Sequence, residues 1–499
     1  MTGMDAAIPT QPCSAPTGFL VVSDLHLGAS LRAPLNGAAL RRVVRVDREL
    51  ERFVNHHLEH RPGEHSEGQW TLVLNGDTFD FMHMDLRPDT QGWLERDEAT
   101  FGLEYTSPRA RWKLATMARY HRRTFKALGR FVAAGHRLVF VVGNHDADLH
   151  FPGVRLELIE HLSSHVEAGQ RESVRAGVKI ARWFYFEPGQ FYVEHGHRFD
   201  PYTTFDDPIV PRAFGRAMHL ATSFTHLASR YFANRIRTLP LHDLDQWKLF
   251  DFVRWGLRKG NLPVGQMLSQ YVSLAARSVR VGLDFQRTVG AHLKNRQRAR
   301  LARLKAYSRV TRLPLEALRK IDELGVKPLT ASAVGGLQAL YVGHVGLGLL
   351  AVLAAITSAI IVDGWLMKLA ASASVLLSTA LFMRVFATWL RPDPDVHPRL
   401  GQAARRIAEE TGAPVVVFGH THRPVHERSE GRHWLNPGAW DHAWRKVAVH
   451  TVEARCTCGL RFARVTRDET GVDAQLVHWC SHFGRPQETG APERLLPPV

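Results

Sequence analysis

The sequence contains Phe19-Leu-Val-Val-Ser-Asp-Leu-His-Leu-Gly28, the first of five stretches in which an apolar, mostly β-branched run ends in a small group of polar residues. The other four are Thr71-Leu-Val-Leu-Asn-Gly-Asp77, Leu138-Val-Phe-Val-Val-Gly-Asn-His-Asp146, Phe191-Tyr-Val-Glu-His-Gly-His197 and Val415-Val-Val-Phe-Gly-His-Thr-His422. Such short runs predict buried strands, with the polar residues on the loops that follow them. Between the second and third, residues 110–134 have apolar side chains at helical spacing. Strands that alternate with helices predict an α/β layered domain.

The composition is that of an ordinary globular protein of more than one structural unit. The chain has 499 residues, 45% of them hydrophobic and 22% charged, which excludes a wholly disordered or fibrous protein. The four cysteines (Cys13, Cys456, Cys458 and Cys480) are too few and too scattered for a disulfide framework, so we expect a reducing compartment. The first apolar run is too short for a secretory signal.

The positive charge is concentrated in one segment. Residues 201–330 contain 23 Lys and Arg against 9 Asp and Glu, a net charge of +14 out of +16 for the whole chain. We expect this segment to form a basic helical insert. Three interpretations remain open: a platform on anionic membrane lipids, a nucleic-acid footprint that would make the protein a nuclease, or a solvated helical face.

An apolar segment directly follows the basic block. Residues 331–362 carry no charge over 32 positions, Asp363-Gly364 interrupts them, and residues 365–390 continue apolar except for Lys368 and Arg384. About 20 apolar residues span a bilayer as a helix, so 331–390 predicts a transmembrane helical hairpin. The alternative is a buried helical pair in a soluble lid. The adjoining hairpin favours the lipid platform over a nucleic-acid partner.

The hairpin fixes an expected topology. If the polar groups on both sides of the insert build one site, they lie on the same side of the membrane, so the number of crossings is even. The basic block beside the hairpin places the body on the cytoplasmic side of the inner membrane by the positive-inside rule.

The five polar ends supply seven residues of a kind that binds metals: Asp24, His26, Asp77, Asn144, His195, His420 and His422. Imidazole nitrogen with carboxylate and amide oxygen suits Mn, Fe or Zn better than a closed structural zinc site, which favours thiolate. Seven donors are too many for one ion, whereas a shared carboxylate can bridge two. We therefore expect two divalent metal ions per chain, Mn before Fe or Zn.

The order Asp-x-His, Gly-Asp, Gly-Asn-His-Asp, His-Gly and Gly-His-x-His resembles the calcineurin-like metallophosphoesterase superfamily. The resemblance implies an α/β/β/α sandwich and a metal-bridging hydroxide that hydrolyses a phosphoester or pyrophosphate bond. It also implies roles for individual residues. Asp24, His26, Asp77 and His422 would hold the first metal, and Asp77 would bridge to a second held by Asn144, His195 and His420. Asn144 and His145 would contact the substrate, His145 would protonate the leaving oxygen, and Asp146 would orient the imidazole of His145.

Within the superfamily, residues 23–28 and 74–81 are most similar to UDP-2,3-diacylglucosamine pyrophosphohydrolases, which act on a lipid-linked nucleotide at the inner face of the membrane. The sequence departs from their main branch at His145, where that branch has Arg, and at His197, where it has Asp. A membrane-proximal substrate such as UDP-2,3-diacylglucosamine is therefore one expectation. The alternatives are a phosphomonoesterase or phosphodiesterase acting on soluble nucleotides or nucleic acid, and a non-catalytic membrane scaffold.

These observations divide the chain into six parts: an N-terminal tail (1–18), a first part of the metallophosphoesterase domain (19–200), the basic insert (201–330), the hairpin (331–390), a second part of the domain (391–483) and a flexible tail (484–499).

Overall fold

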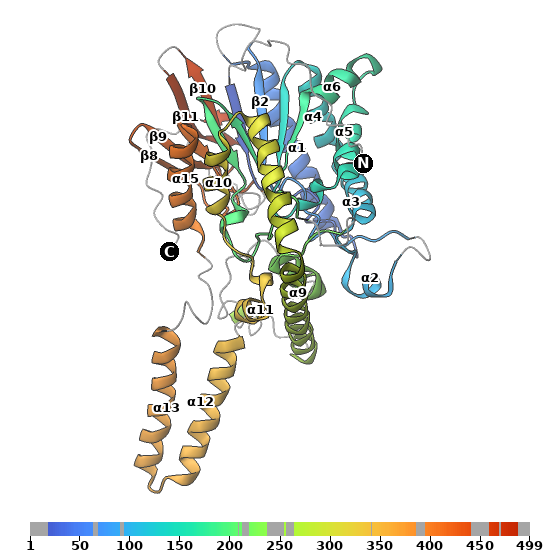
Figure 1. Cartoon of the computed structure of the whole chain (residues 1–499). Coiled ribbons are helices and arrows are strands. Elements are labelled where there is room, and N and C mark those ends of the chain that lie inside the picture. The colour runs from blue at the N-terminus through green and yellow to red at the C-terminus, as the bar shows by residue number, and fades with distance from the viewer. Residues whose placement is uncertain are drawn as a thin grey trace.

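The structure is a computed structural model that describes residues 18–62, 68–89, 94–207, 209–211, 219–236, 254–255, 264–340, 342–385, 395–440, 459–468 and 471–487. These residues form two mixed β-sheets with helices around them (Figure 1). Three of the cysteines (Cys13, Cys456 and Cys458) lie outside the described residues, as does the predicted N-terminal tail up to residue 17. Cys480 is buried.

The larger sheet has seven strands, and its parallel half carries three of the predicted strands. Its order is β12 (Arg485–Gln487), β11 (Gly471–Cys480), β10 (Arg461–Asp468), β1 (Gly18–Val22), β2 (Trp70–Asn75), β3 (Arg137–Val141) and β4 (Val178–Ala181). Strands β1 to β4 are parallel, and β10, β11 and β12 extend the sheet beyond β1, each antiparallel to the strand before it. Because parallel strands end at the same edge of a sheet, the polar groups after β1, β2 and β3 are brought together.

The smaller sheet joins chain segments from before and after the insert. Its order is β5 (Phe184–Glu187), β6 (Phe191–Glu194), β7 (Val415–Val417), β9 (Arg432–Asn436) and β8 (Val425–Ser429). Strand β6 pairs in parallel with β7, more than two hundred residues later in the chain. The loops that carry His195 and His420 are therefore neighbours.

The two sheets pack face to face, and helices cover their outer faces. Phe19 and Val21 of β1 contribute to a core between the sheets, where the ring of Phe19 lies 4.3 Å from that of Phe191. Leu20 and Val22 point the opposite way, as alternate residues of a strand do, into a core shared with four helices. These are α1 (Gly37–Glu59), α3 (Ser107–Tyr120), α4 (Arg122–Ala133) and α5 (Pro152–Ser163). Helices α10 (Leu315–Glu323) and α15 (His397–Thr411) cover the smaller sheet.

Residues 110–134, whose apolar spacing predicts helix, lie in two helices, α3 and α4. The helical path breaks between α3 and α4 at His121, whose φ of −97° and ψ of 35° are not helical. The imidazole of His121 lies between two distant groups: Nδ1 is 2.7 Å from Oδ1 of Asp47, and Nε2 accepts a hydrogen bond from the backbone N–H of Gly28. Shorter elements complete this half: α2 (Arg96–Phe101), α6 (Arg171–Gly177), η1 (Ala147–His150), η2 (Ala168–Gln170) and η3 (His197–Phe199).

The described part of the basic insert is helical, as predicted. It contains α7 (Phe224–Tyr231), η4 (Ala233–Arg235), the 48-residue α9 (Val264–Thr311), α10 and η6 (Leu329–Ala331). Three arginines of α9 form ion pairs with acidic residues elsewhere in the insert: Arg296 with Asp206, Arg300 with Asp322, and Arg303 with Asp207. Part of the positive charge of α9 is therefore paired within the protein.

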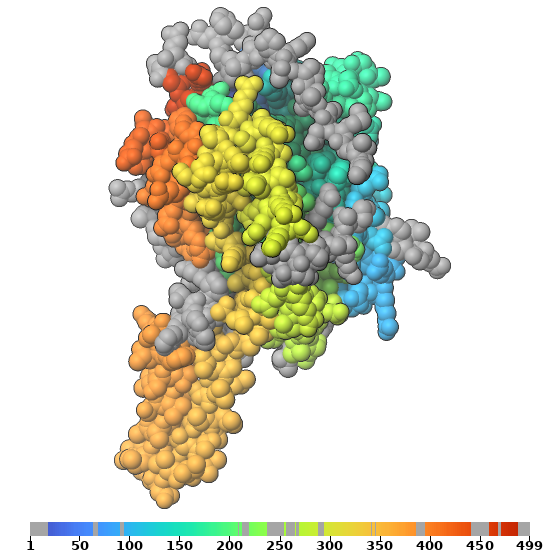
Figure 2. All heavy atoms as spheres, in the orientation of Figure 1, coloured from blue at the N-terminus to red at the C-terminus, as the bar shows by residue number. Residues whose placement is uncertain are grey.

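The apolar segment forms three helices. Helix α11 (Ala333–Ala339) packs on α9, where a Cβ at Gly282 would clash with the backbone of Ser332 and Ala333. Helices α12 (Val342–Ile361) and α13 (Trp365–Val385) form an antiparallel hairpin that projects from the body (Figures 1 and 2). Both are long and apolar enough to cross a membrane, with mean hydropathies of 2.2 and 1.7. The predicted turn is confirmed, since Gly364 has a φ of +80°.

The C-terminal prediction needs one correction. Residues 485–487, placed in the flexible tail, form strand β12, because they pair with residues 478–480 at the edge of the larger sheet. The remainder of that tail, 488–499, lies outside the described residues.

Candidate metal centre

The backbone of the site loops is held in an unusual conformation. Among the residues that the structure describes, seven other than glycine have positive φ, and five of them are predicted metal ligands, namely Asp24 (56°), His26 (48°), Asp77 (50°), His420 (68°) and His422 (57°). This left-handed conformation costs free energy for residues with a Cβ, and such residues cluster at sites where a side chain must be aimed. The loops after β1, β2 and β7 therefore turn sharply to direct these side chains to one point.

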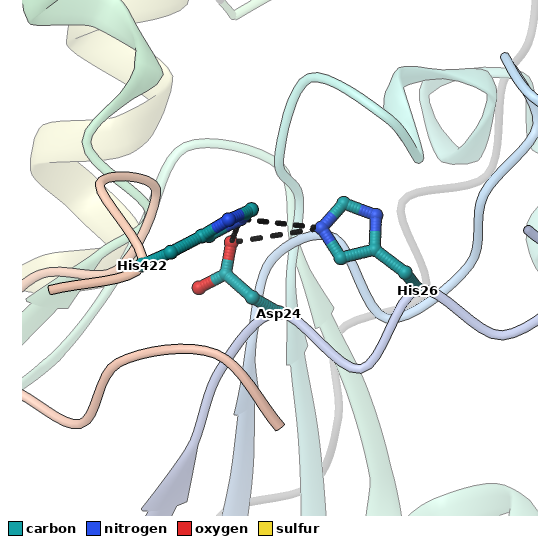
Figure 3. Close-up of side chains that lie close together, drawn as sticks. All are labelled: Asp24, His26 and His422. Carbon is teal, nitrogen blue, oxygen red and sulfur yellow. Dashed lines mark hydrogen bonds and ion pairs between the residues drawn. The ribbon is translucent and has the colours of Figure 1, made fainter. Parts of the chain in front are cut away.

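Asp24, His26 and His422 form a first group of donors (Figure 3). Nε2 of His422 lies 3.1 Å from Oδ1 of Asp24 and 3.4 Å from Nε2 of His26. The first two residues follow β1, whereas His422 follows β7, so residues almost four hundred positions apart complete the group.

Asp77, His195 and His420 form a second group. Nε2 of His195 lies 3.2 Å from Oδ2 of Asp77. The same oxygen is 4.0 Å from Nε2 of His26, which belongs to the first group. Asp77 therefore lies between the two groups, at the position where a bridging carboxylate is needed.

The loop that carries Asn144 lies against the second group, because Gly143 allows a close approach. A Cβ at Gly143 would clash with Asp77 and the ring of His195. The side chain of Asn144 is 1% exposed, and its Oδ1 has no hydrogen-bond partner among the described residues. A buried amide oxygen without a partner costs free energy, and a cation would remove this cost. The seven predicted ligands are thus all gathered in one region; their ligation of metal stays a prediction.

The hydrogen bonds of the histidines indicate which ring nitrogen has a lone pair available for a cation. Nδ1 of His195 donates to the carbonyl of Asn75, which can only accept, so in the neutral ring the lone pair is on Nε2. This lone pair faces the carboxylate of Asp77. In the first group, Nε2 of His422 faces Oδ1 of Asp24 and Nε2 of His26 at 3.1 and 3.4 Å. Two lone pairs at such distances repel each other unless a proton or a cation lies between them. Ligand bonds of about 2.0–2.2 Å place neighbouring donors roughly 3 Å apart, so this set fits divalent ions.

The pKa values of these residues also indicate a site that favours positive charge. Burial lowers the pKa of His195, but the Asp77 carboxylate outweighs burial and raises it to about 9. Burial raises the pKa of Asp24, but His422 outweighs burial and lowers it to about 2. Each carboxylate thus stabilises positive charge at its neighbour, as a cation site requires.

One important residue was missed by the sequence analysis. Asp80, fully buried after β2, accepts from three histidines: Nδ1 of His145 at 3.1 Å, Nδ1 of His26 at 3.3 Å and Nδ1 of His83 at 2.9 Å. Burial raises the pKa of Asp80, but His83 and His145 outweigh burial and hold it well below its usual range. The signal for it was the spacing Gly76-Asp77-Thr78-Phe79-Asp80, with His83 three residues later.

This finding changes the role expected for Asp146. The prediction placed the carboxylate of Asp146 against the imidazole of His145, but Asp80 holds that ring. The carboxylate of Asp146 accepts instead from the backbone N–H groups of Gly143 (2.7 Å) and Thr78 (2.8 Å). Asp146 therefore joins the loop after β3 to the loop after β2. His197 is buried nearby but belongs to neither donor group.

Comparison with known proteins gives a partial match. No family model matches the chain. A UDP-2,3-diacylglucosamine hydrolase from Sodalis glossinidius (strain morsitans) is 33% identical over 92 residues, which is 17% of this chain. The match spans 38% of that relative's length. The chain is thus similar in part to a hydrolase, and its buried His/Asp clusters are consistent with the calcineurin-like metallophosphoesterase superfamily.

Proposed function

We propose that the protein is a phosphoesterase that uses two divalent metal ions. The observation that carries the proposal is the pair of donor groups with Asp77 between them, whose nitrogen and oxygen lone pairs face one another. Asp24, His26, Asp77 and His422 would hold one ion, and Asp77, Asn144, His195 and His420 the other. When bound, two such ions acidify water and neutralise the oxygens of a phosphoryl group.

The protein's own residues supply the remaining chemistry. Nδ1 of His145 is held by Asp80, so the ring directs Nε2 toward the centre, 3.9 Å from Oδ2 of Asp77. A leaving oxygen on a phosphate beside Asp77 would lie within reach of this nitrogen, which would give it a proton. General acid catalysis of this kind contributes about 10²–10⁴-fold in rate. The loop of His145 is fixed by its own backbone N–H, which donates to Asp77 Oδ1 at 2.8 Å.

The proposal includes a membrane anchor. Helices α12 and α13 expose large apolar side chains on a projection of their own (Figure 2), including Ile360 at 74% and Leu377 at 70%. Little or none of the most apolar stretch of either helix is buried within the protein, whereas a core helix is mostly buried. Burial of this surface in lipid would stabilise it strongly. We place the body at the cytoplasmic face of the inner membrane, because the positive charge adjoins the hairpin.

The connection between the donor groups and the anchor supports a lipid-linked substrate. Tyr202, seven residues after His195 in the chain, belongs to a hydrophobic cluster with Leu329 before α11 and Ala339 within it. We call this the insert cluster; its buried members are Tyr202, Phe224, Leu227, Tyr231, Leu274, Leu329, Ala339 and Leu340. Because α11 leads directly into α12, one packed unit joins the loop beside His420 to the base of the hairpin.

This packed connection supports a substrate whose phosphate lies at the membrane surface. Together with the partial similarity to a UDP-2,3-diacylglucosamine hydrolase, this favours a substrate such as UDP-2,3-diacylglucosamine. Anionic lipids would be further partners of the basic insert. Arg296, Arg300 and Arg303 would not take part, because they are paired with acidic residues of the insert itself.

The test uses the full chain in detergent with Mn²⁺, UDP-2,3-diacylglucosamine and ¹⁸O-labelled water, with mass spectrometry of the products. Bis(p-nitrophenyl) phosphate serves as a generic substrate. We expect label in UMP or in the acylated sugar phosphate, and a loss of more than about 100-fold in Asn144→Ala. Asn55→Ala is the matched control, since Asn55 contacts Arg130 away from the site. Turnover of the generic phosphodiester alone would reject the lipid substrate, and no Mn²⁺-dependent turnover of either would reject the enzyme.

A further inference from the structure

The ring of His420 is held by a carboxylate that lies outside both donor groups. Nε2 of His420 is 3.0 Å from Oδ2 of Asp200 and 3.4 Å from Oγ1 of Thr203. Asp200 follows η3, five residues after His195, whereas His420 follows β7. The contact therefore joins the two loops that supply histidines to the second group.

Asp200 is itself fixed. It is 9% exposed, and its Oδ1 accepts the backbone N–H of Tyr202 at 2.9 Å, so its two carboxylate oxygens have separate partners. Its carbonyl accepts the N–H of Thr204 at 2.9 Å. Next in the chain, the carbonyl of Pro201 accepts the N–H of Leu329. With Tyr202 in the insert cluster, the packed insert holds Asp200 in place.

This contact selects the nitrogen that His420 can offer to a cation. An ionised carboxylate only accepts hydrogen bonds, so the neutral ring of His420 carries its proton on Nε2 and its lone pair on Nδ1. His195 has the opposite arrangement, because its Nδ1 donates to Asn75 and its lone pair is on Nε2. The two histidines of the second group are thus each fixed in one tautomer by a different partner.

We propose that Asp200 is a positioning residue for the second metal ion: it fixes the tautomer and orientation of His420, so that Nδ1 is the nitrogen available to the ion. The inference rests on the proposed function, because it assumes that the second group binds an ion. Carboxylates that hold metal-binding histidines in this way change metal affinity by about 10- to 100-fold when they are removed.

The test measures Mn²⁺ binding to the metal-free full chain in detergent, by calorimetry and by electron paramagnetic resonance, without substrate. Wild type is expected to bind two ions, with the spectrum of a coupled pair. Asp200→Ala should bind the first ion normally and the second about 10- to 100-fold more weakly, so that one equivalent of Mn²⁺ gives the spectrum of an isolated ion. Asp200→Asn should be intermediate, since its amide oxygen still accepts from Nε2 but has no charge.

Asp206→Asn is the matched control, because Asp206 lies on the same segment but pairs with Arg296 of α9. It should leave both affinities unchanged. Wild-type affinity for both ions in the two Asp200 variants would overturn the inference and leave the proposed function intact. Equal weakening in Asp206→Asn would overturn it too, since it would mean a general loosening of the segment. If Asp200→Ala does not fold, the isosteric Asn variant decides. Wild type that binds no Mn²⁺ would overturn the proposed function and the inference together.

Discussion

Nδ1 of His145 lies 3.1 Å from Oδ1 of Asp80, whose other oxygen lies 3.3 Å from Nδ1 of His26. The buried carboxylate of Asp80 thus orients His145, which is proposed to protonate the leaving oxygen. It also orients His26, a predicted ligand of the first ion. The two histidines lie edge to face, with ring centroids 4.6 Å apart, so a shift of one ring moves the other.

We predict that Asp80→Asn lowers kcat on bis(p-nitrophenyl) phosphate by about 10- to 100-fold, with a smaller change in KM. The reason is that the amide has no charge to hold three imidazoles in their present tautomers. Steady-state kinetics with saturating Mn²⁺ measure the effect. Asp85→Asn is the control, because Asp85 pairs with Arg87 instead. Activity of Asp80→Asn within twofold of wild type would contradict the role of Asp80.

Acid should destabilise the protein through His57. This buried side chain is packed among Phe53, Trp70, Phe462 and Trp479, and burial lowers its pKa to about 3. Unfolded His57 takes up a proton near pH 6.5 that folded His57 does not bind, so stability falls as the pH drops from about 6.5 towards 3. The loss from this residue is about 1.4 kcal/mol per pH unit over that range.

Replacement by phenylalanine removes this proton uptake. We expect His57→Phe to lose less unfolding free energy than wild type between pH 6.5 and 4.5, measured by urea unfolding at each pH. His482→Gln is the control, because His482 is exposed. Parallel pH dependence in wild type and His57→Phe would show that other groups govern acid unfolding.

Deletion of residues 342–385 should release the protein from the membrane. The deletion spares α11, which packs on α9, so the body is expected to stay folded and to keep Mn²⁺-dependent hydrolysis of a soluble phosphodiester. Fractionation at high salt, followed by assay of the supernatant, measures both outcomes. Continued tight membrane binding of the deletion would place the anchor elsewhere.

Arg198→Ala should destabilise the body by about 3–5 kcal/mol. Arg198 is 1% exposed; its Nε lies 2.5 Å from Oε1 of Glu194, and its Nη2 donates to the carbonyl of Ile321 in α10. The alanine variant leaves the Glu194 charge buried beside Trp183, and unfolding in urea followed by circular dichroism measures the loss. Arg319→Ala, which removes an exposed partner of Glu316, should change the free energy of unfolding by less than about 1 kcal/mol. Equal effects of the two variants would mean that the buried pair is not stabilising.

The sequence by itself determined the elements whose signals are local. The apolar runs form strands β1, β2, β3, β6 and β7, and the turn at Gly364 ends one apolar helix and begins the next. The gathering of the polar ends could also be expected, because parallel strands end at one edge of a sheet. The metal ligation of these residues, the membrane crossing and the substrate stay predictions.

Only the tertiary structure decided which carboxylate holds which histidine. Asp80 rather than Asp146 holds His145, and Asp200 holds His420 across 220 positions of sequence. Likewise, His121 at the break between α3 and α4 contacts Asp47, and three arginines of α9 pair with acidic residues from other segments of the insert. A strand or a helix is specified by its immediate neighbours in the chain. A hydrogen bond between loops depends on strand register and on the left-handed turns at Asp24, Asp77 and His420, which no single segment specifies.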